Sequence, residues 1–186
     1  MTRRSCQPFF VDLPARITLA ALLCTAGLAH ADLKIGVIAS STGVTAVVGI
    51  PQKNTVALLP AEIGGQKVEY IVLDDASDPT NAVTNLKKLL TEHKVDALIG
   101  PSTTPAALAM LDFVAESKTP LLTTVGSSAL VQPMDDKRKW VFKTTQNDDL
   151  IAEAVIGHMT QSGVKTIGFI GFNDPYGENW YKVFSA

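Results

Sequence analysis

The sequence predicts an α/β fold with a doubly wound, mainly parallel sheet. Short apolar runs, such as Leu33 to Ala39, alternate with stretches whose apolar residues recur at helical spacing. These runs are continuous instead of alternating with polar residues, as expected for strands that are buried on both faces. The connections between them are short, which indicates βαβ units with helices on both sides of the sheet.

The first 31 residues have the features of a secretory signal peptide. Arg3, Arg4 and Arg16 supply positive charge, residues 17–29 are nearly all apolar, and Ala29-His30-Ala31 has a small-x-small pattern. The apolar run is shorter than the roughly 20 residues that span a bilayer. We therefore expect secretion with cleavage after Ala31, and we disfavour the alternative of an N-terminal membrane anchor.

Composition excludes several classes of function. Both cysteines, Cys6 and Cys24, lie in the predicted signal peptide, so the mature chain would use neither disulfides nor cysteine chemistry. The formal net charge is −2, and no basic cluster is extensive enough to indicate nucleic-acid binding. We therefore expect no nucleic-acid partner.

Six apolar runs predict the strands of the sheet, namely residues 33–39, 67–73, 95–99, 120–123, 140–143 and 166–172. Helical spacing or helix-start signals predict helices between them, within residues 50–63, 78–90, 104–114, 151–159 and from 178 onward.

Proline and glycine set the boundaries of the first helix. Pro51 lies near its start and Pro60 lies inside it, so we expect the helix to end or kink near Pro60. Gly64-Gly65 then predicts a turn into the second strand.

Two later helices begin with a polar residue followed by proline. Asp78 precedes Pro79 and Thr104 precedes Pro105. An N-cap side chain followed by proline at the first helical position is a frequent helix start. We therefore predict that Asp78 and Thr104 are N-caps.

Clusters of hydroxyl side chains follow three of the predicted strands: Ser40-Ser41-Thr42, Ser102-Thr103-Thr104 and Ser127-Ser128. Ligands bind to open parallel sheets at the carboxyl ends of the strands, where these clusters would meet. Hydroxyls and free N–H groups at helix starts are suitable partners for a carboxylate. Helix capping alone could also account for each cluster, and both interpretations remain open at this point.

No set of residues for catalysis or for a cofactor is present. Asp74, Asp75 and Asp78 could form a metal or phosphoryl site, but they run into a helix-start signal and capping explains them better. The sequence lacks a P-loop, a G-x-G-x-x-G motif and a G-x-S-x-G motif. We expect no metal site, no cofactor and no enzymatic activity, and a small-molecule ligand that is bound without turnover.

Five segments in a fixed order carry a specific resemblance. They are LKIGVIASSTG, VLDDASDPTNAVTNLKKLL, VDALIGPSTTPAALAM, TPLLTTVGSS and GVKTIGFIGFNDPYGENW. With the signal peptide, they make the chain resemble the solute-binding proteins of ABC importers, most closely the leucine/isoleucine/valine-binding type of periplasmic protein. The resemblance implies the type I periplasmic binding fold, a periplasmic location and an ABC permease of the inner membrane as partner.

The resemblance also implies how the chain is divided. Residues 32–147 would form the ligand-binding N-terminal lobe, which is nearly complete, and residues 148–186 would begin a truncated second lobe. Members of the family are much longer, so we expect this chain to be an N-terminal fragment. The implied function is capture of a small carboxylate ligand, a branched-chain or related amino acid, between two lobes. A sensor domain of the same fold and a binding protein for aromatic carboxylates remain alternatives.

The site residues follow from the same resemblance. In the family, the first lobe holds the ligand carboxylate after its third and fourth strands, which here places Ser102, Thr103, Thr104, Ser127 and Ser128 in the site. The loop after the first strand would line the cleft near Val48, where the family often has an aromatic residue. Tyr176, in the DPYGE turn, would be the ligand contact from the second lobe.

Overall fold

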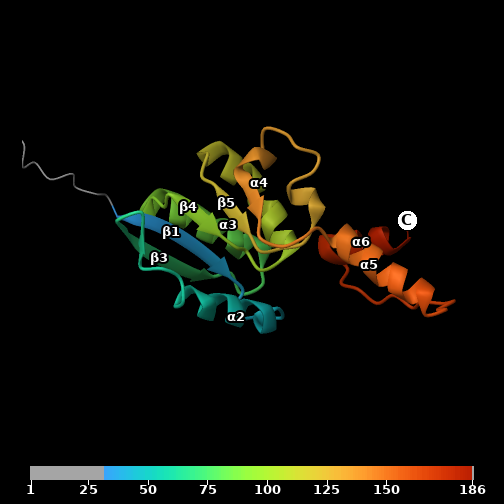
Figure 1. The fold of residues 1–186 in the computed structure, drawn as a ribbon. Coiled ribbons are helices and arrows are strands. Elements are labelled where there is room, and N and C mark those ends of the chain that lie inside the picture. Colours follow the sequence, from blue (N-terminus) through green and yellow to red (C-terminus); the bar gives the residue numbers. More distant parts are fainter. Residues whose placement is uncertain (1–31, 186) are drawn as a thin grey trace, which may run out of the picture. The chain divides into compact units, whose positions relative to one another are not determined.

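The computed structural model describes residues 32–185, so the signal peptide and its cleavage after Ala31 lie outside the described residues. The strands are β1 (Leu33–Ala39), β2 (Glu62–Ile63), β3 (Gln66–Asp74), β4 (Ala97–Ile99), β5 (Leu121–Thr123) and β6 (Val141–Lys143). They form one sheet in the order β2-β3-β1-β4-β5-β6 (Figure 1). All neighbours are parallel except β2, which is antiparallel to β3. The predicted mainly parallel sheet is confirmed.

Helices cover both faces of this sheet. They are α2 (Ala46–Val56), α3 (Pro79–Lys88) with a π-helical turn η1 (Leu89–His93), α4 (Thr104–Ser117), the short 3₁₀ helices η2 (Ser128–Leu130) and η3 (Arg138–Trp140), α5 (Asp148–Gln161) and α6 (Pro175–Ser185). Figure 1 shows α3 and α4 on one face of the sheet and α2 on the other. The doubly wound arrangement is therefore confirmed as well.

Strand register assigns side chains to the two faces. Leu98 pairs with Leu121, and Leu121 pairs with Val141, and all three are buried in the core that α3 and α4 cover. Burying a leucine or valine side chain completely contributes about 1.5–3 kcal/mol. Leu122 and Phe142 pair on the opposite face, where they are 39% and 54% exposed. The α3–α4 face therefore holds the main core.

The start of the first helix differs from the prediction, and the structure adds a short strand, β2, that was not predicted. The expected helix over residues 50–63 is wrong at its start, because α2 begins at Ala46 and accommodates Pro51 in its interior, whereas its end at Val56 agrees with the expected end near Pro60. Residues 62–63 instead form β2, which pairs with β3. Gly64 and Gly65 have φ of 60° and 81°, a conformation that lets the chain reverse in a tight hairpin.

The predicted strand over residues 166–172 is also wrong. The structure shows no regular secondary structure there, and every side chain from 161 to 173 is exposed. A strand is stable only when a neighbour satisfies its backbone N–H and C=O groups. Within residues 32–185, the sheet includes no strand from this segment. Among the helices of the same range, none combines the length and hydropathy that a membrane-spanning segment requires.

Candidate ligand-binding site at the sheet edge

Three hydroxyl-rich strand ends meet at the carboxyl edge of the sheet. Because β1, β4 and β5 are parallel neighbours, the residues that follow them lie side by side. Ser40 follows β1, Ser102 comes shortly after β4, and Thr124 follows β5. The backbone N–H of Ser40 donates to Oγ of Ser102 at 2.9 Å, which joins the first two strand ends directly.

Gln52 of α2 connects this edge to the third strand end. Its Oε1 accepts a hydrogen bond from the Ser102 hydroxyl at 2.5 Å, and its Nε2 donates to Oγ1 of Thr124 at 3.1 Å. Thr124 in turn donates to the carbonyl of Pro101 at 3.0 Å. One amide side chain therefore fixes the polar groups at the ends of β4 and β5.

Helix α2 can reach this network because it packs directly on the end of β1. At Gly49, a Cβ atom would lie 2.1 Å from the carbonyl oxygen of Ser40. Only glycine permits so close an approach between helix and strand. Gln52 lies one turn further along the same helix, which places its side chain over the sheet edge.

The cluster after β4 does not serve as a helix cap. Thr104 was expected to be the N-cap, but it is the first residue of α4, and Thr103 occupies the cap position without a side-chain capping hydrogen bond. The hydroxyl of Ser102 is engaged with Ser40 and Gln52, and that of Thr104 is buried with no hydrogen-bond partner among residues 32–185. The capping interpretation is therefore wrong for this cluster, and in the part of the chain that the structure describes no side chain satisfies the first N–H groups of α4.

The cluster after β5 has similar features. Ser127 is the N-cap residue of η2 and makes no side-chain capping hydrogen bond, and Ser128 is the first residue of that short helix. Ser127 is only 1% exposed. Both residues follow Thr124, so they continue the edge that Gln52 organises. Capping does not account for this cluster either.

In the cluster after β1, Ser41 and Thr42 bond to Asp74 at the start of the neighbouring loop. Asp74 accepts hydrogen bonds from the backbone N–H of Ala76 at 2.9 Å and from the Thr42 hydroxyl at 2.7 Å. Burial opposes its ionisation, but these bonds and others from Thr42 and Ser41 outweigh it and lower the pKa of Asp74 from 3.8 to about 2. The β1–α2 loop is therefore tied to the β3–α3 loop by a stable carboxylate.

Asp78 behaves as the sequence predicts. Its Oδ1 accepts from the N–H groups of Thr80 and Asn81 at 2.7 and 3.0 Å, and Pro79 follows as the first helical residue of α3. These bonds hold the pKa of Asp78 below its ordinary value: the Asn81 contribution is the largest, burial acts against it, and Thr80 adds to it. Asp78 therefore has a structural role as the N-cap of α3.

Val48 and Tyr176 lie in different places. Val48 is 46% exposed and precedes Gln52 by one turn of α2, so it lies beside the polar edge. Tyr176 is 41% exposed and belongs to α6. Its ring centroid is 6.4 Å from those of Phe172 and Trp180. The structure therefore brings Val48, but not Tyr176, together with the hydroxyl clusters.

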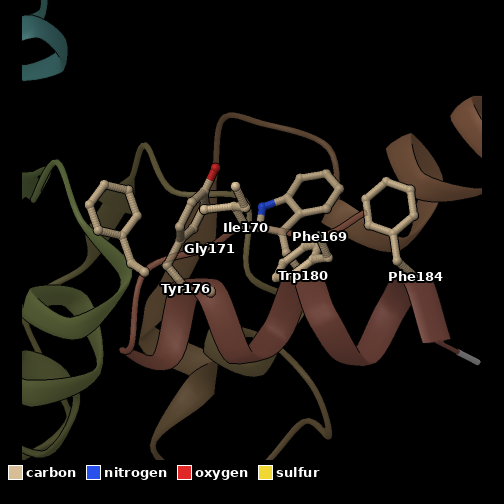
Figure 2. Close-up of a pocket in the computed structure, with 8 residues that line it drawn as sticks. Phe169, Ile170, Gly171, Tyr176, Trp180 and Phe184 are labelled. Atoms are coloured by element: carbon tan, nitrogen blue, oxygen red, sulfur yellow. The ribbon is translucent and has the colours of Figure 1, made fainter. Parts of the chain in front are cut away.

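Tyr176 lines a separate aromatic hollow of about 360 Å³. Figure 2 shows Tyr176, Trp180 and Phe184 in a row along α6, with Phe169 and Ile170 of the preceding segment beside them. Ile170 is fully exposed, and no charged side chain lines the hollow. The hollow offers apolar contact area and no cationic side chain that would form an ion pair with a carboxylate.

Comparisons with known proteins now identify the fold family. The model of a family described as periplasmic binding protein matches residues 32–186. The chain belongs to this family. It is 30% identical over 178 residues to the Leu/Ile/Val-binding protein BraC3 of Rhizobium johnstonii, a match that covers 91% of this chain and 47% of the relative. It is 26% identical over 184 residues to Leu/Ile/Val-binding protein homolog 3 of Brucella melitensis, covering 95% and 49%.

A solved structure agrees with this assignment. The crystal structure of an extracellular ligand-binding receptor from Rhodopseudomonas palustris HaA2 superposes with a TM-score of 0.81 at 53% identity, over 83% of this chain and 43% of that one. The chain therefore spans less than half the length of the relatives that it matches. The resemblance to Leu/Ile/Val-binding periplasmic proteins and the type I periplasmic binding fold are confirmed, and the relatives are binding proteins, not enzymes.

Gln52 is the residue of this edge that the sequence did not reveal. Its one local signal is that it is the first side chain with hydrogen-bonding groups after the apolar run from Ala46 to Pro51. That signal becomes informative only when α2 is known to pack over the end of β1, because the partners of Gln52 are 50 and 72 residues away in the chain.

Proposed function

We propose that this protein is the periplasmic solute-binding component of an ABC importer and captures a small carboxylate ligand for an inner-membrane permease. Family membership and the names of the two Leu/Ile/Val-binding relatives support this function. In this proposal, residues 32–147 are the N-terminal ligand-binding lobe and residues 148–186 begin the second lobe. The ligand is held between the two lobes.

The observation that carries the proposal is the uncapped hydroxyl edge of the sheet. Thr103 leaves the first N–H groups of α4 without a side-chain partner, and Ser127 does the same for η2. A helix N-terminus with free N–H groups attracts a carboxylate through hydrogen bonds and through the helix dipole. We infer that Ser102, Thr103 and Thr104 with Ser127 and Ser128 receive the ligand carboxylate.

The surroundings of this edge suit a ligand with a short apolar body. Val44, just before α2, and Val47 and Val48 in its first turn are 86%, 80% and 46% exposed. Branched aliphatic side chains would bury this apolar surface favourably, at about 25 cal/mol per Å². We therefore infer a branched-chain or related amino acid as ligand, with Tyr176 as the contact from the second lobe.

Equilibrium dialysis tests the proposal. The full-length secreted protein, with both lobes, is dialysed against labelled L-leucine, L-isoleucine, L-valine and benzoate, alongside its Thr103→Ala and Ser127→Ala variants. Each substitution removes a polar partner of a charged carboxylate, so affinity should fall by about 1–3 kcal/mol, or roughly 5- to 150-fold. Thr84→Ala is the matched control, since Thr84 is an exposed residue of α3 bonded to Thr80.

The outcomes separate the possibilities. Preference for the aliphatic amino acids supports the proposed ligand class, and preference for benzoate replaces it with an aromatic carboxylate. Equal affinity for the wild type and for both variants would remove the hydroxyl clusters from the site. Absence of binding to every acid tested would contradict the proposed function.

A further inference from the structure

Asp148 is a buried carboxyl group at the point where the chain leaves the sheet and enters α5. It is the first residue of that helix and is only 3% exposed. A carboxylate buried to this extent requires hydrogen-bond partners. Asn179 of α6 supplies one, because its Nδ2 donates to Oδ2 of Asp148 at 2.9 Å. Asp148 therefore connects α5 to α6.

The same carboxyl group lies against the loop that begins the Ser127-Ser128 cluster. The backbone N–H of Asp148 donates to the carbonyl of Gly126 at 3.2 Å. At Gly126, a Cβ atom would lie 2.0 Å from Oδ1 of Asp148, so any larger residue would displace the carboxyl group. Lys143 also donates through Nζ to the carbonyl of Gly126, and to Oδ1 of Asn147 at 2.6 Å.

Two threonines extend this attachment along the strand exit. The hydroxyl of Thr144 donates to the carbonyl of Thr123 at 3.2 Å, and the hydroxyl of Thr145 donates to the carbonyl of Val125 at 3.0 Å. The backbone from β5 to Gly126 is thus bonded to residues 143–148 through the carbonyls of Thr123, Val125 and Gly126. Ser127 and Ser128 directly follow this backbone segment, so their position depends on its bonds to residues 143–148.

The charges at this point offset one another. Burial raises the pKa of Asp148, the positive charge of Lys143 and the bond from Asn179 act against this, and the neighbouring Asp149 adds to it. Burial lowers the pKa of Lys143, and Asp148 and Asp149 oppose that shift. The groups that face Asp148 are therefore Lys143 from β6, Asp149 from α5 and the neutral Asn179 from α6.

We propose that Asp148 is a positioning residue that couples the ligand loop Gly126–Ser128 to helix α6. Its backbone N–H bonds to the Gly126 carbonyl, its Oδ1 occupies the space that a side chain at position 126 would need, and its Oδ2 accepts from Asn179. Asn179 lies three residues after Tyr176, on adjacent turns of α6. A displacement of Gly126 or of Asn179 would therefore shift the same residue, Asp148, and through it the other contact. This coupling rests on the proposed function in assigning the loop and Tyr176 to the ligand.

Amide hydrogen exchange tests the coupling without ligand. In Asn179→Ala, exchange of the amides of Val131 and Gln132, which donate to the Ser128 carbonyl at 3.0 and 2.8 Å, should rise by about tenfold, although Asn179 does not bond to that loop. Amides of β1, from Leu33 to Ala39, should keep their wild-type rates, which separates local coupling from global destabilisation. Glu178→Ala, at an exposed neighbouring position on α6, is the control and should leave the loop unchanged.

Variants of Asp148 complete the test. Asp148→Ala should accelerate exchange at the loop and in α6 together, whereas Asp148→Asn keeps an acceptor for Asn179 and should remain within about threefold of wild type. The carboxyl ¹³C resonance of Asp148 should titrate at higher pH in Asn179→Ala, because a bond to the charged form is lost. If Asn179→Ala affects α6 alone, the coupling is overturned.

Dialysis against L-leucine distinguishes this inference from the proposed function. Reduced affinity in Asp148→Ala together with retained affinity in Asp148→Asn supports both. If the wild type binds no ligand while the exchange results hold, the proposed function fails and the coupling is structural only. If the wild type binds leucine but Asp148→Ala binds it equally well, the positioning role is refuted and the proposed function stands.

Discussion

Replacing Gln52 with alanine should lower the free energy of unfolding by about 1–2 kcal/mol. The substitution removes two hydrogen bonds, from the Ser102 hydroxyl at 2.5 Å and to Thr124 at 3.1 Å. Thr124 still donates to the Pro101 carbonyl, and Ser102 still accepts from Ser40 while its half-exposed hydroxyl can donate to water. The loss therefore stays near the ordinary net value for two hydrogen bonds, about 1 kcal/mol each, without a further desolvation penalty.

Urea denaturation followed by circular dichroism measures this difference, and a thermal scan should show a shift of about 2–8 °C. Asn54→Ala is the matched control, because Asn54 is an exposed residue of the same helix. It should change stability by no more than about 0.5 kcal/mol. A loss in Gln52→Ala no larger than in Asn54→Ala would refute the argument that Gln52 organises the sheet edge.

Gln52→Glu separates stability from binding. Glutamate keeps an acceptor for the Ser102 hydroxyl but cannot donate to Thr124, so it loses one of the two bonds. It also places a negative charge beside the proposed carboxylate site. We expect its stability to fall between those of the wild type and the alanine variant, and its affinity for L-leucine to fall further than that of Gln52→Ala, because like charges repel.

Two further predictions concern the loops around the site. Asp74→Asn should cost about 1 kcal/mol at pH 7, because the charge is solvent-exposed and its contribution is screened. Since the pKa of Asp74 is lowered in the folded state to about 2, this contribution is present above about pH 4 and should disappear as the pH falls towards 2. Urea midpoints measured across that range check the sign, and a difference independent of pH would contradict it. Gly49→Ala should destabilise by about 1–3 kcal/mol, because its Cβ would lie 2.1 Å from the Ser40 carbonyl oxygen. Gly157→Ala in α5 has no atom within 4 Å of the new Cβ and should stabilise slightly, so equal effects of the two substitutions would show that α2 can shift without cost.

Much of the sheet could be predicted because its signals are local. A strand buried on both faces must be apolar throughout, so the run from Leu33 to Ala39 is visible without knowledge of its neighbours. The start of α3 is equally local, since Asp78 bonds to residues two and three positions ahead. Such features depend on the chain within a few residues, and the structure confirms them.

The hydroxyl clusters show the limit of local signals. A threonine followed by proline predicts an N-cap at Thr104, but the chain places Thr103 there and uses Ser102 to join two strand ends. Whether a hydroxyl of this cluster caps α4 or joins two strand ends depends on the positions of Gln52 and Ser40, which are distant in the sequence. The capping signature is the same in both cases, so the sequence around residue 104 could not decide between them.

The segment from 166 to 172 makes the same point for strands. Its apolar composition indicates that these side chains favour burial, and the strand was predicted from that composition alone. A strand also needs hydrogen-bond partners on a neighbouring strand, and composition carries no information about whether a partner is present. In residues 32–185 the segment instead packs Phe169 against Tyr181 and Phe184 of α6, at ring-centroid distances of 5.6 and 6.5 Å. Contacts with α6, which follows this segment in the chain, thus bury part of its apolar surface. They do not supply the backbone hydrogen bonds that a β-strand needs from a neighbouring strand.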